Sequence, residues 1–405
     1  MVIGLIRPDS KMQNYQNLTS LSAIEPPHWM ACRVKDLQRL HDDVIIWDAQ
    51  VDEVSPDMSG CDEIEIWATG VHPSAWIQEQ AGVDRLKLKT TNVTIIDHLP
   101  FDAKKVSPDW SLFNMNKYHA HNWQTWGSKQ TLAPYGTVHT SVSCPYKCKF
   151  CTIHSYYGTK YATRYIESVV NDLNVLSNSG VKNVKVMDEL FLTKKSGDLL
   201  KAIINETENN FNIWGYSRVD TLPDNLGIVK TAGVNWICLG IESGNQEIRQ
   251  SMNKGKFTNE DIRNSVTRLK DAGISVLGNF MFGFPDDTFS TMQETLDLAI
   301  ELNCEYSNFY CVVPYPGTEL ESYAKEQKWE LPKEPSQYAQ YSYDFLPLPT
   351  KYLTAKEVLK FRDTAWLKYH KNTEYLQMVL RKFGMDVLKE INEMTSRKLE
   401  RKLLP

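Results

Sequence analysis

The chain has 405 residues, which is more than one ordinary domain needs and suggests two or three. Hydrophobic residues make up 42% and charged residues 23%, the usual balance of a globular protein with a sizeable core. A formal net charge of -5 leaves no surplus of Lys and Arg, so we expect no nucleic-acid partner. The first apolar run is too short for a signal peptide, and no run approaches the roughly 18 apolar residues of a membrane span.

Eight cysteines are present, and three of them fall within residues 144–151. A secreted disulfide framework would distribute cysteines in pairs through a smaller chain. We therefore expect a reducing, cytoplasmic location.

The first hundred residues alternate strand-like and helical segments. Apolar residues recur at three- and four-residue spacing over residues 29–40, which predicts a helix there. Strands are expected at residues 2–6, 44–47, 65–69 and 93–96. This alternation predicts a parallel, doubly wound, Rossmann-like sheet. Because ligands of such sheets lie beyond the carboxyl ends of the strands, the loop at residues 70–74 is placed to touch one.

The alternation resumes from residue 136, after an irregular stretch that we expect to be a linker. Helices are expected at residues 166–177, 292–302 and 354–370. Strands are expected at residues 137–142, 183–187, 213–216, 236–240, 275–281 and 306–313. These six units predict a partial (β/α)6 barrel of the TIM type, followed by a helical C-terminal region. The expected division is 1–105 for the Rossmann-like domain, 106–134 for the linker, 135–325 for the barrel and 326–405 for the helical region.

Cys144, Cys148 and Cys151 directly follow a predicted strand with the spacing C-x3-C-x2-C. Thiolates hold iron–sulfur clusters, and three of them leave the fourth iron of a 4Fe-4S cluster open to a substrate. A structural zinc would want a fourth ligand, and zinc motifs usually come as paired C-x2-C units. His154 is close enough in sequence to complete a zinc set, so that alternative stays open.

With the aromatic Phe150 before the last cysteine, the motif resembles the signature of radical S-adenosylmethionine (SAM) enzymes. The resemblance implies that Cys144, Cys148 and Cys151 are the metal ligands and form the catalytic centre. It also implies that the cluster cleaves SAM reductively to a 5′-deoxyadenosyl radical, with an electron donor such as flavodoxin or ferredoxin.

The same resemblance implies SAM contacts at the ends of later strands. Asp188 and Glu189 would meet the SAM ammonium, and Arg218 would bind its carboxylate through two parallel hydrogen bonds. Glu242 and Ser243 would hydrogen-bond the ribose. Two alternatives remain open: an exposed acid pair at a helix N-terminus for Asp188 and Glu189, and internal ion pairs or caps for the others.

Segments outside the cluster motif resemble a subgroup of radical SAM proteins with an amino-terminal cobalamin-binding domain. The segments are residues 23–27, 46–50, 72–75, 118–123 and 346–350. The subgroup includes the anaerobic magnesium-protoporphyrin ester cyclase and many methyltransferases. The resemblance therefore implies cobalamin as a further cofactor.

In that subgroup we would expect Glu25, Pro26, His72 and Ser74 at the cobalamin cleft. Residues 9–15 lack the D-x-H-x-x-G motif whose His ligates cobalt, so the domain could instead be a scaffold. His72 could equally be a loop histidine satisfied by backbone.

The linker carries His119, His121 and Trp123 just before the barrel. They could line the space between cobalamin and SAM, or they could form a packed domain seam.

Taken together, we expect an enzyme that transfers a methyl group, with cobalamin, to an unactivated carbon of a small or lipid-like metabolite. A first alternative is an oxidation or cyclisation with the same cofactors and without methyl transfer. A second is an iron–sulfur redox or binding protein that no longer cleaves SAM.

Overall fold

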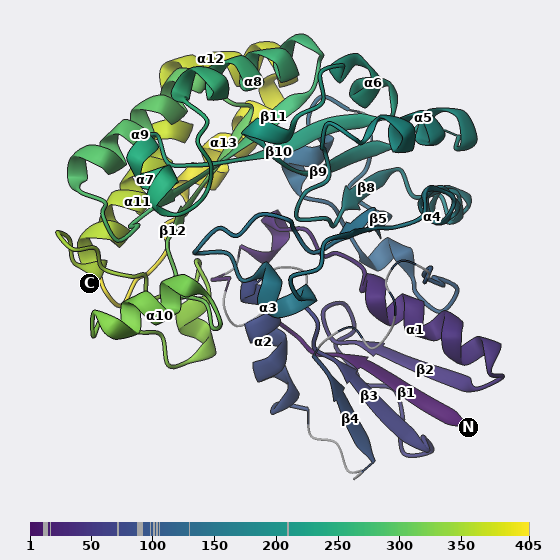
Figure 1. Cartoon of the computed structure of the whole chain (residues 1–405). Helices are drawn as coiled ribbons and strands as arrows, with labels where there is room; N and C mark the ends of the chain where they lie inside the picture. The colour runs from purple at the N-terminus through teal and green to yellow at the C-terminus, as the bar shows by residue number, and fades with distance from the viewer. Residues whose placement is uncertain are drawn as a thin grey trace.

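The computed structural model describes residues 1–404 except 11–14, 17, 71–72, 87–91, 98, 100–101, 103, 105, 129 and 209. Two parallel sheets form the framework of the fold. The strands of the smaller sheet run from the outer end of the molecule toward the larger sheet (Figure 1).

The smaller sheet has the strand order β2-β1-β3-β4, and all of its pairings are parallel. Its elements are β1 (Val2–Arg7), α1 (His28–Arg39), β2 (Asp43–Asp48), β3 (Glu63–Trp67), α2 (Pro73–Val83) and β4 (Val93–Ile96). Branched apolar residues dominate the central strand, where Ile3, Leu5 and Ile6 are buried. The prediction of an α/β fold with a parallel sheet in this region is confirmed.

The larger sheet has six parallel strands in the order β12-β11-β10-β9-β8-β5. Its strands are β5 (Tyr135–Val138), β8 (Asn183–Val186), β9 (Asn212–Arg218), β10 (Val234–Glu242), β11 (Ser275–Phe282) and β12 (Tyr306–Cys311). The connecting helices are α4 (Ile166–Asn178), α5 (Gly197–Glu206), α6 (Leu226–Thr231), α7 (Gln246–Ser251), α8 (Asn259–Asp271) and α9 (Phe289–Leu302). They lie along the outside of the sheet (Figure 1).

One predicted strand is divided in two in the structure, whereas others differ only in their bounds. The segment 137–142 was expected to be continuous, but β5 ends at Val138 and a separate short strand, β6 (Ser141–Val142), follows. The chain leaves the sheet because the backbone N–H of Thr140 and the hydroxyl of Ser141 donate to the buried Asp188 carboxylate, both at 2.7 Å.

Several helices begin at a threonine that caps them. The side chains of Thr258, before α8, and Thr288, before α9, each accept a hydrogen bond from the backbone N–H of the third helical residue. The side chain of that third residue in turn accepts a hydrogen bond from the backbone N–H of the threonine. Such a capping box is worth about 1 kcal/mol and defines where the helix begins. Local sequence therefore sets the start of these two helices.

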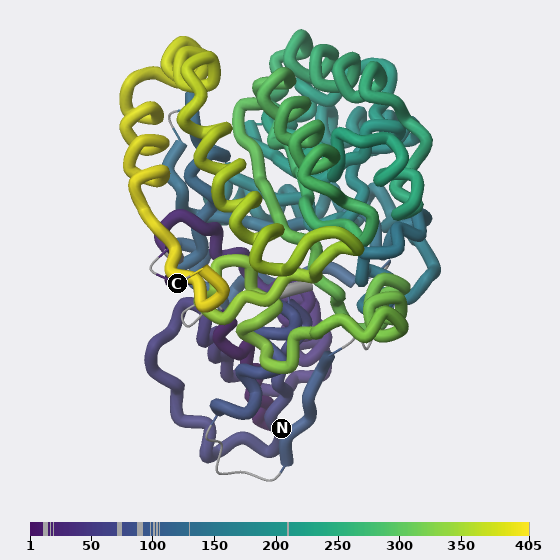
Figure 2. The backbone as a smooth tube through the Cα atoms, turned by 90° about the vertical axis from the view of Figure 1, so that its left-hand side faces the viewer, coloured from purple at the N-terminus to yellow at the C-terminus, as the bar shows by residue number. Residues whose placement is uncertain are grey.

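The C-terminal part comprises α10 (Glu319–Glu326), α11 (Ala355–His370), α12 (Thr373–Phe383) and α13 (Met385–Ser396). Figure 2 shows α11 to α13, in yellow-green and yellow, along one side of the molecule. Arg362 Nε donates to the carbonyl of Phe309 in the edge strand β12 at 2.7 Å, so α11 covers that edge. In the described part of the chain, no helix is both long and apolar enough to cross a bilayer.

The linker residues His119, His121 and Trp123 lie in a packed seam. His119 forms an antiparallel bridge with Ile24. His121 accepts from the backbone N–H of Ala23 at 3.1 Å, and its ring stacks on Trp123 at 5.2 Å. Of the two alternatives considered for these residues, the contacts favour the seam.

A buried ion pair connects the larger sheet to the segment that precedes α1. Lys185 of β8 places its Nζ 3.0 Å from Glu25 Oε1, and only 3% and 4% of the two side chains are exposed. The same ammonium lies 4.9 Å from the ring centre of Trp214. Because a buried charge is strongly destabilising without its partner, this contact constrains how the sheets meet.

We expect Lys185→Met to destabilise the protein by about 3–5 kcal/mol, because it leaves the Glu25 carboxylate buried without its lysine. The double variant Glu25→Gln/Lys185→Met should recover most of that loss. Chemical denaturation of both single variants and the double variant measures the coupling. Lys201→Met, at an exposed pair with Asp198, is the control and should change stability by less than about 0.5 kcal/mol. Additive single effects would contradict the assignment.

Candidate active site

The three motif cysteines lie on a loop whose two ends are tied together. β6 pairs antiparallel with β7 (Ala162–Thr163), which brings residues 143 and 161 close. Ser143 adopts a left-handed backbone with φ +68°, and its hydroxyl donates to the Gly158 carbonyl at 2.6 Å. The loop therefore leaves the carboxyl end of β5 and returns to the same place.

The tip of this loop is held by segments distant in sequence. The backbone N–H of Lys149 donates to the Met252 carbonyl at 3.1 Å, and its own carbonyl accepts from Leu320 N–H at 3.0 Å. Phe150 packs against Phe284, with ring centres 5.5 Å apart. The aromatic position of the motif thus anchors the loop in a small apolar cluster beside β11.

The thiols of Cys144, Cys148 and Cys151 are half-buried and free of disulfides. Burial raises the pKa of the Cys144 and Cys151 thiols, so a bound metal would have to supply the charge that keeps them as thiolates. Among the residues that the structure describes, no three His, Cys, Asp or Glu side chains converge as ligands of a single metal ion would. Cysteines that each bind a different iron of a cluster need not converge, so the donor set fits a 4Fe-4S group.

His154 of α3 (Ile153–Tyr157) does not behave as a fourth ligand of this set. Its Nε2 lies 2.7 Å from the carbonyl oxygen of Cys144, within hydrogen-bond distance. That nitrogen is therefore engaged with backbone, which argues against the zinc alternative.

Asp188 and Glu189, adjacent in sequence, have different environments after β8. Asp188 is buried, and its carboxylate accepts hydrogen bonds from Thr140 and Ser141, so it shapes the start of the cysteine loop. Burial raises the pKa of Asp188 to about 6.

Glu189 is half-buried, and its carboxylate forms no hydrogen bond with the described residues. Burial raises the pKa of Glu189 to about 7, although the nearby Lys185 opposes this shift. Glu189 is therefore available to a ligand, whereas Asp188 is committed to the fold.

Arg218, at the end of β9, is also committed to protein partners. Its Nε and Nη2 donate to the two Asp220 oxygens, each at 2.9 Å, and Nη2 also donates to the Lys254 carbonyl. Its Nη1 lies 3.7 Å from Cys148 Sγ. Its Cζ lies 3.8 Å from the centre of the Tyr146 ring.

Glu242 and Ser243 lie at the end of β10 and both have protein partners. Glu242 has a left-handed backbone with φ +68°, and its Oε1 lies 2.7 Å from Lys254 Nζ. Ser243 is buried, with its hydroxyl 3.2 Å from that of Thr295. These contacts correspond to the internal ion pair and the local bonding that the sequence left open.

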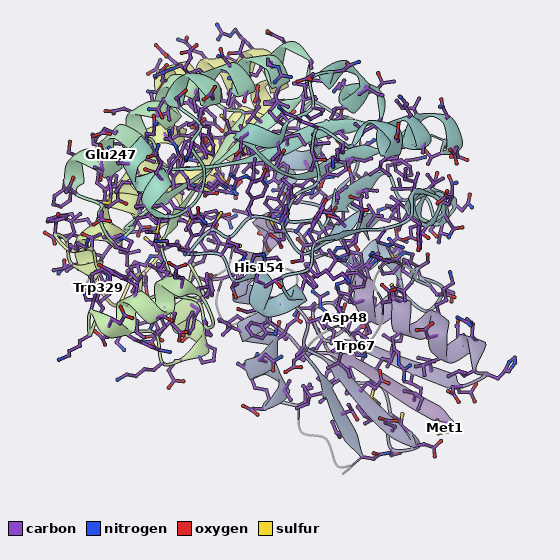
Figure 3. The ribbon with its side chains drawn as sticks, viewed as in Figure 1. Met1, Asp48, Trp67, His154, Glu247 and Trp329 are labelled. Carbon is purple, nitrogen blue, oxygen red and sulfur yellow. The ribbon has the colours of Figure 1, made fainter. Side chains whose placement is uncertain are left out.

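A crevice lies where the two sheets face each other. In the order β2-β1-β3-β4, the switch point is between β1 and β3, where parallel sheets bind ligands. Figure 3 labels Asp48 and Trp67 at the ends of β2 and β3, with His154 of the larger part above them. The crevice is lined by Arg7, Pro26, Pro27, His28, Trp29, Thr69, Gly70, His139, Tyr157 and Met187.

The described side chains leave about 20 Å³ in this crevice, which is room for about one water. Arg7 Nε donates to Glu79 at 3.1 Å and its Nη1 to Asp48 at 3.3 Å, so a buried ion network closes the floor. Among the described residues, His28 Nε2 and His139 Nδ1 have no hydrogen-bond partner, and burial lowers the pKa of both, that of His28 to about 3. The position fits a ligand, but the residues as placed do not form a cradle for cobalamin.

The residues expected at a cobalamin cleft are only partly gathered there. Pro26 lines the crevice, whereas the Glu25 carboxylate meets Lys185 of the larger sheet. His72 and the side chain of Ser74 lie outside the described residues.

Sequence reasoning missed three charged or polar residues that shape the site: Lys185, Lys254 and His139. Lys185 stands within the apolar strand run 183–187, and a charge in such a run signals a buried ion pair. His139 lies inside the predicted strand 137–142, which precedes the cysteine motif, and a polar residue in such a strand is a comparable signal. Lys254 carries no comparable signal, because it lies in a polar loop.

Residues 138–299 match the sequence model of the Radical SAM superfamily. The resemblance to this superfamily expected from the cysteine motif is confirmed over these residues. An uncharacterised methyltransferase of Pyrococcus horikoshii is 27% identical over 278 residues, which cover 68% of this chain and 56% of that protein. The bacteriochlorophyllide d C-12(1)-methyltransferase of Chlorobaculum tepidum is 27% identical over 284 residues, covering 68% and 58%. The chain therefore spans little more than half of these relatives.

A solved structure shares the fold. It is the radical S-adenosylmethionine methyltransferase TsrM from Kitasatospora setae, with cobalamin and a [4Fe-4S] cluster bound. The TM-score is 0.64 at 13% identity, and the match covers 97% of this chain and 99% of that one. Residues 138–299 thus form a domain of the radical SAM superfamily, in a chain related to methyltransferases.

Proposed function

We propose that this chain cleaves SAM at a 4Fe-4S cluster on Cys144, Cys148 and Cys151 and methylates an unactivated carbon of a small or lipid-like molecule. The loop geometry carries the proposal: three free thiols on one tied loop, at the carboxyl end of β5, within the matched domain. A reduced cluster, when bound, supplies one electron that breaks a C–S bond of SAM, giving methionine and a 5′-deoxyadenosyl radical.

The proposal assigns an architecture to the chain. Residues 1–105 act as a Rossmann-like domain, 106–134 as a linker, 135–325 as a partial (β/α)6 barrel and 326–405 as a helical cover. The sequential order of β5 and β8 to β12 supports the barrel. The switch point between β1 and β3 supports the first domain.

Glu189 is the residue that we propose to bind the SAM ammonium. Its half-buried carboxylate has no hydrogen bond from the described residues. It lies near Cys144 and Cys151, and, besides burial, its charge helps to raise the pKa of both thiols. Glu242 and Ser243 lie at the end of β10 and are proposed to hold the ribose, Glu242 while paired with Lys254.

The proposal that the chain transfers a methyl group rests on its similarity to proteins named as methyltransferases. The two relatives in sequence are named methyltransferases, and the TsrM structure contains cobalamin. Cobalamin carried by residues 1–105 would serve as the methyl carrier. Because the described crevice is small, we derive no step through it.

A second candidate is an oxidation or cyclisation without methyl transfer. The crevice of about 20 Å³ between the described side chains would suit this reaction in a form where residues 1–105 act as a scaffold without cobalamin. In both cases we propose a cytoplasmic enzyme supplied with electrons by a donor such as flavodoxin or ferredoxin.

After anaerobic reconstitution with iron and sulfide, the protein should bind about four irons per chain, as one 4Fe-4S cluster requires. Cys148→Ala should lose most of that iron, because one corner of the cluster has no ligand. Cys61→Ala, in the smaller sheet's part of the chain, is the matched control and should retain it. His154→Ala should also retain it, and loss of metal in that variant would favour zinc. Iron and sulfide analysis makes the measurement.

Glu189→Gln should weaken SAM binding about 10- to 100-fold, the effect of losing a charge-assisted hydrogen bond of about 1.5–3 kcal/mol. Binding is followed by the change that SAM causes in the electron paramagnetic resonance (EPR) spectrum of the reduced cluster. Glu247→Gln, exposed on α7 at the rim of the molecule (Figure 3), is the control. Equal affinity in both variants would remove Glu189 from the site.

With SAM, cobalamin and dithionite, the reconstituted protein should form 5′-deoxyadenosine. S-adenosylhomocysteine together with cobalamin retained through gel filtration would support methyl transfer. Deoxyadenosine without retained cobalamin would favour the oxidation or cyclisation. A full cluster that yields no deoxyadenosine would leave an iron–sulfur redox or binding protein.

A further inference from the structure

We propose that Arg218 is a positioning residue for the cluster, which hydrogen-bonds the Cys148 thiolate and raises the reduction potential, rather than the partner of the SAM carboxylate. The inference rests on the cluster assignment above. It concerns one side chain, 5% exposed, at the last position of β9.

Most N–H donors of the Arg218 guanidinium already have protein acceptors. Arginine has five N–H donors arranged along two forked edges. The Nε–Nη2 edge is filled by Asp220, with both contacts at 2.9 Å. The second hydrogen of Nη2 is donated to the Lys254 carbonyl. Only Nη1 remains, so the two parallel hydrogen bonds of a carboxylate clamp find no free edge.

Nη1 points to sulfur. It lies 3.7 Å from Cys148 Sγ, a normal distance for an N–H donor to sulfur. The Tyr146 ring covers one face of the guanidinium, with 3.8 Å from Cζ to the ring centre. Asp220, Lys254 and Tyr146 therefore fix the plane of the group and leave it little freedom to turn toward another ligand.

The position of Arg218 is fixed by packing as well. A Cβ on Gly255 would lie 3.0 Å from Nη2, so the glycine gives the guanidinium its room. Lys254 itself is held by Glu242, with Nζ 2.7 Å from Oε1. The loop of residues 253–255 thus forms a frame around Arg218.

A cationic donor on a cluster thiolate has a defined effect. Reduction adds one electron to the cluster and makes it more negative, and hydrogen bonds to the sulfurs and nearby positive charge stabilise that state. Arg218 should therefore make the cluster easier to reduce. In the redox titration described next, dithionite supplies the electron and is oxidised as the cluster is reduced.

The experiment is an EPR-monitored redox titration of the reconstituted full chain and its variants. Arg218→Met should shift the reduction equilibrium at least about tenfold toward the oxidised cluster, which is about 59 mV for a one-electron couple. SAM affinity, from the EPR change of the reduced cluster, should stay within about threefold of the parent. Arg263→Met removes an exposed cation from α8 and should change neither quantity.

Two results would overturn the inference: an unchanged potential in Arg218→Met, or a SAM affinity that falls more than about tenfold in that variant. If Arg218→Met fails to load iron, Arg218→Lys replaces it and should lower the potential by less. A parent protein that binds no cluster contradicts the proposed function instead, and iron analysis separates the two failures.

Discussion

The ammonium group of Lys185 is the contact on which the arrangement of the two sheets depends. It reaches from β8 to the carboxylate of Glu25, which precedes α1, and it lies over the face of Trp214. Both charged side chains are buried, so neither tolerates loss of the other. The carboxyl ends of β1 and β3 are thereby brought opposite those of β5 and β8, and the crevice forms between them.

The carboxyl end of β8 also supplies residues of the candidate site. Asp188, two residues beyond β8, accepts hydrogen bonds from Thr140 and Ser141. These bonds turn the chain away from the line of β5, where the cysteine loop begins. Glu189, the neighbour of Asp188, carries the remaining carboxylate, free of hydrogen bonds to described residues. One strand therefore joins the domains, shapes the cysteine loop and presents the group proposed to bind SAM.

A series of contacts places positively charged side chains beside the cysteine loop. Glu242 holds Lys254, the Lys254 carbonyl accepts from Arg218, and Arg218 approaches Cys148. Arg218 and Glu242 were expected to bind SAM, yet both already bond to protein groups. The cost of burying a charge without a partner explains why side chains at strand ends bond to one another first.

The sequence by itself determined the local features of this protein. The spacing of Cys144, Cys148 and Cys151 is encoded within eight residues, and strand–helix alternation needs only neighbouring residues, so the α/β class and the radical SAM domain were predicted. Only the tertiary structure distinguished Asp188 from Glu189, turned Arg218 toward sulfur, and joined Glu25 to Lys185 across 160 residues. The physical reason is that burial and hydrogen-bond partners arise from segments distant in the chain, which no local pattern records.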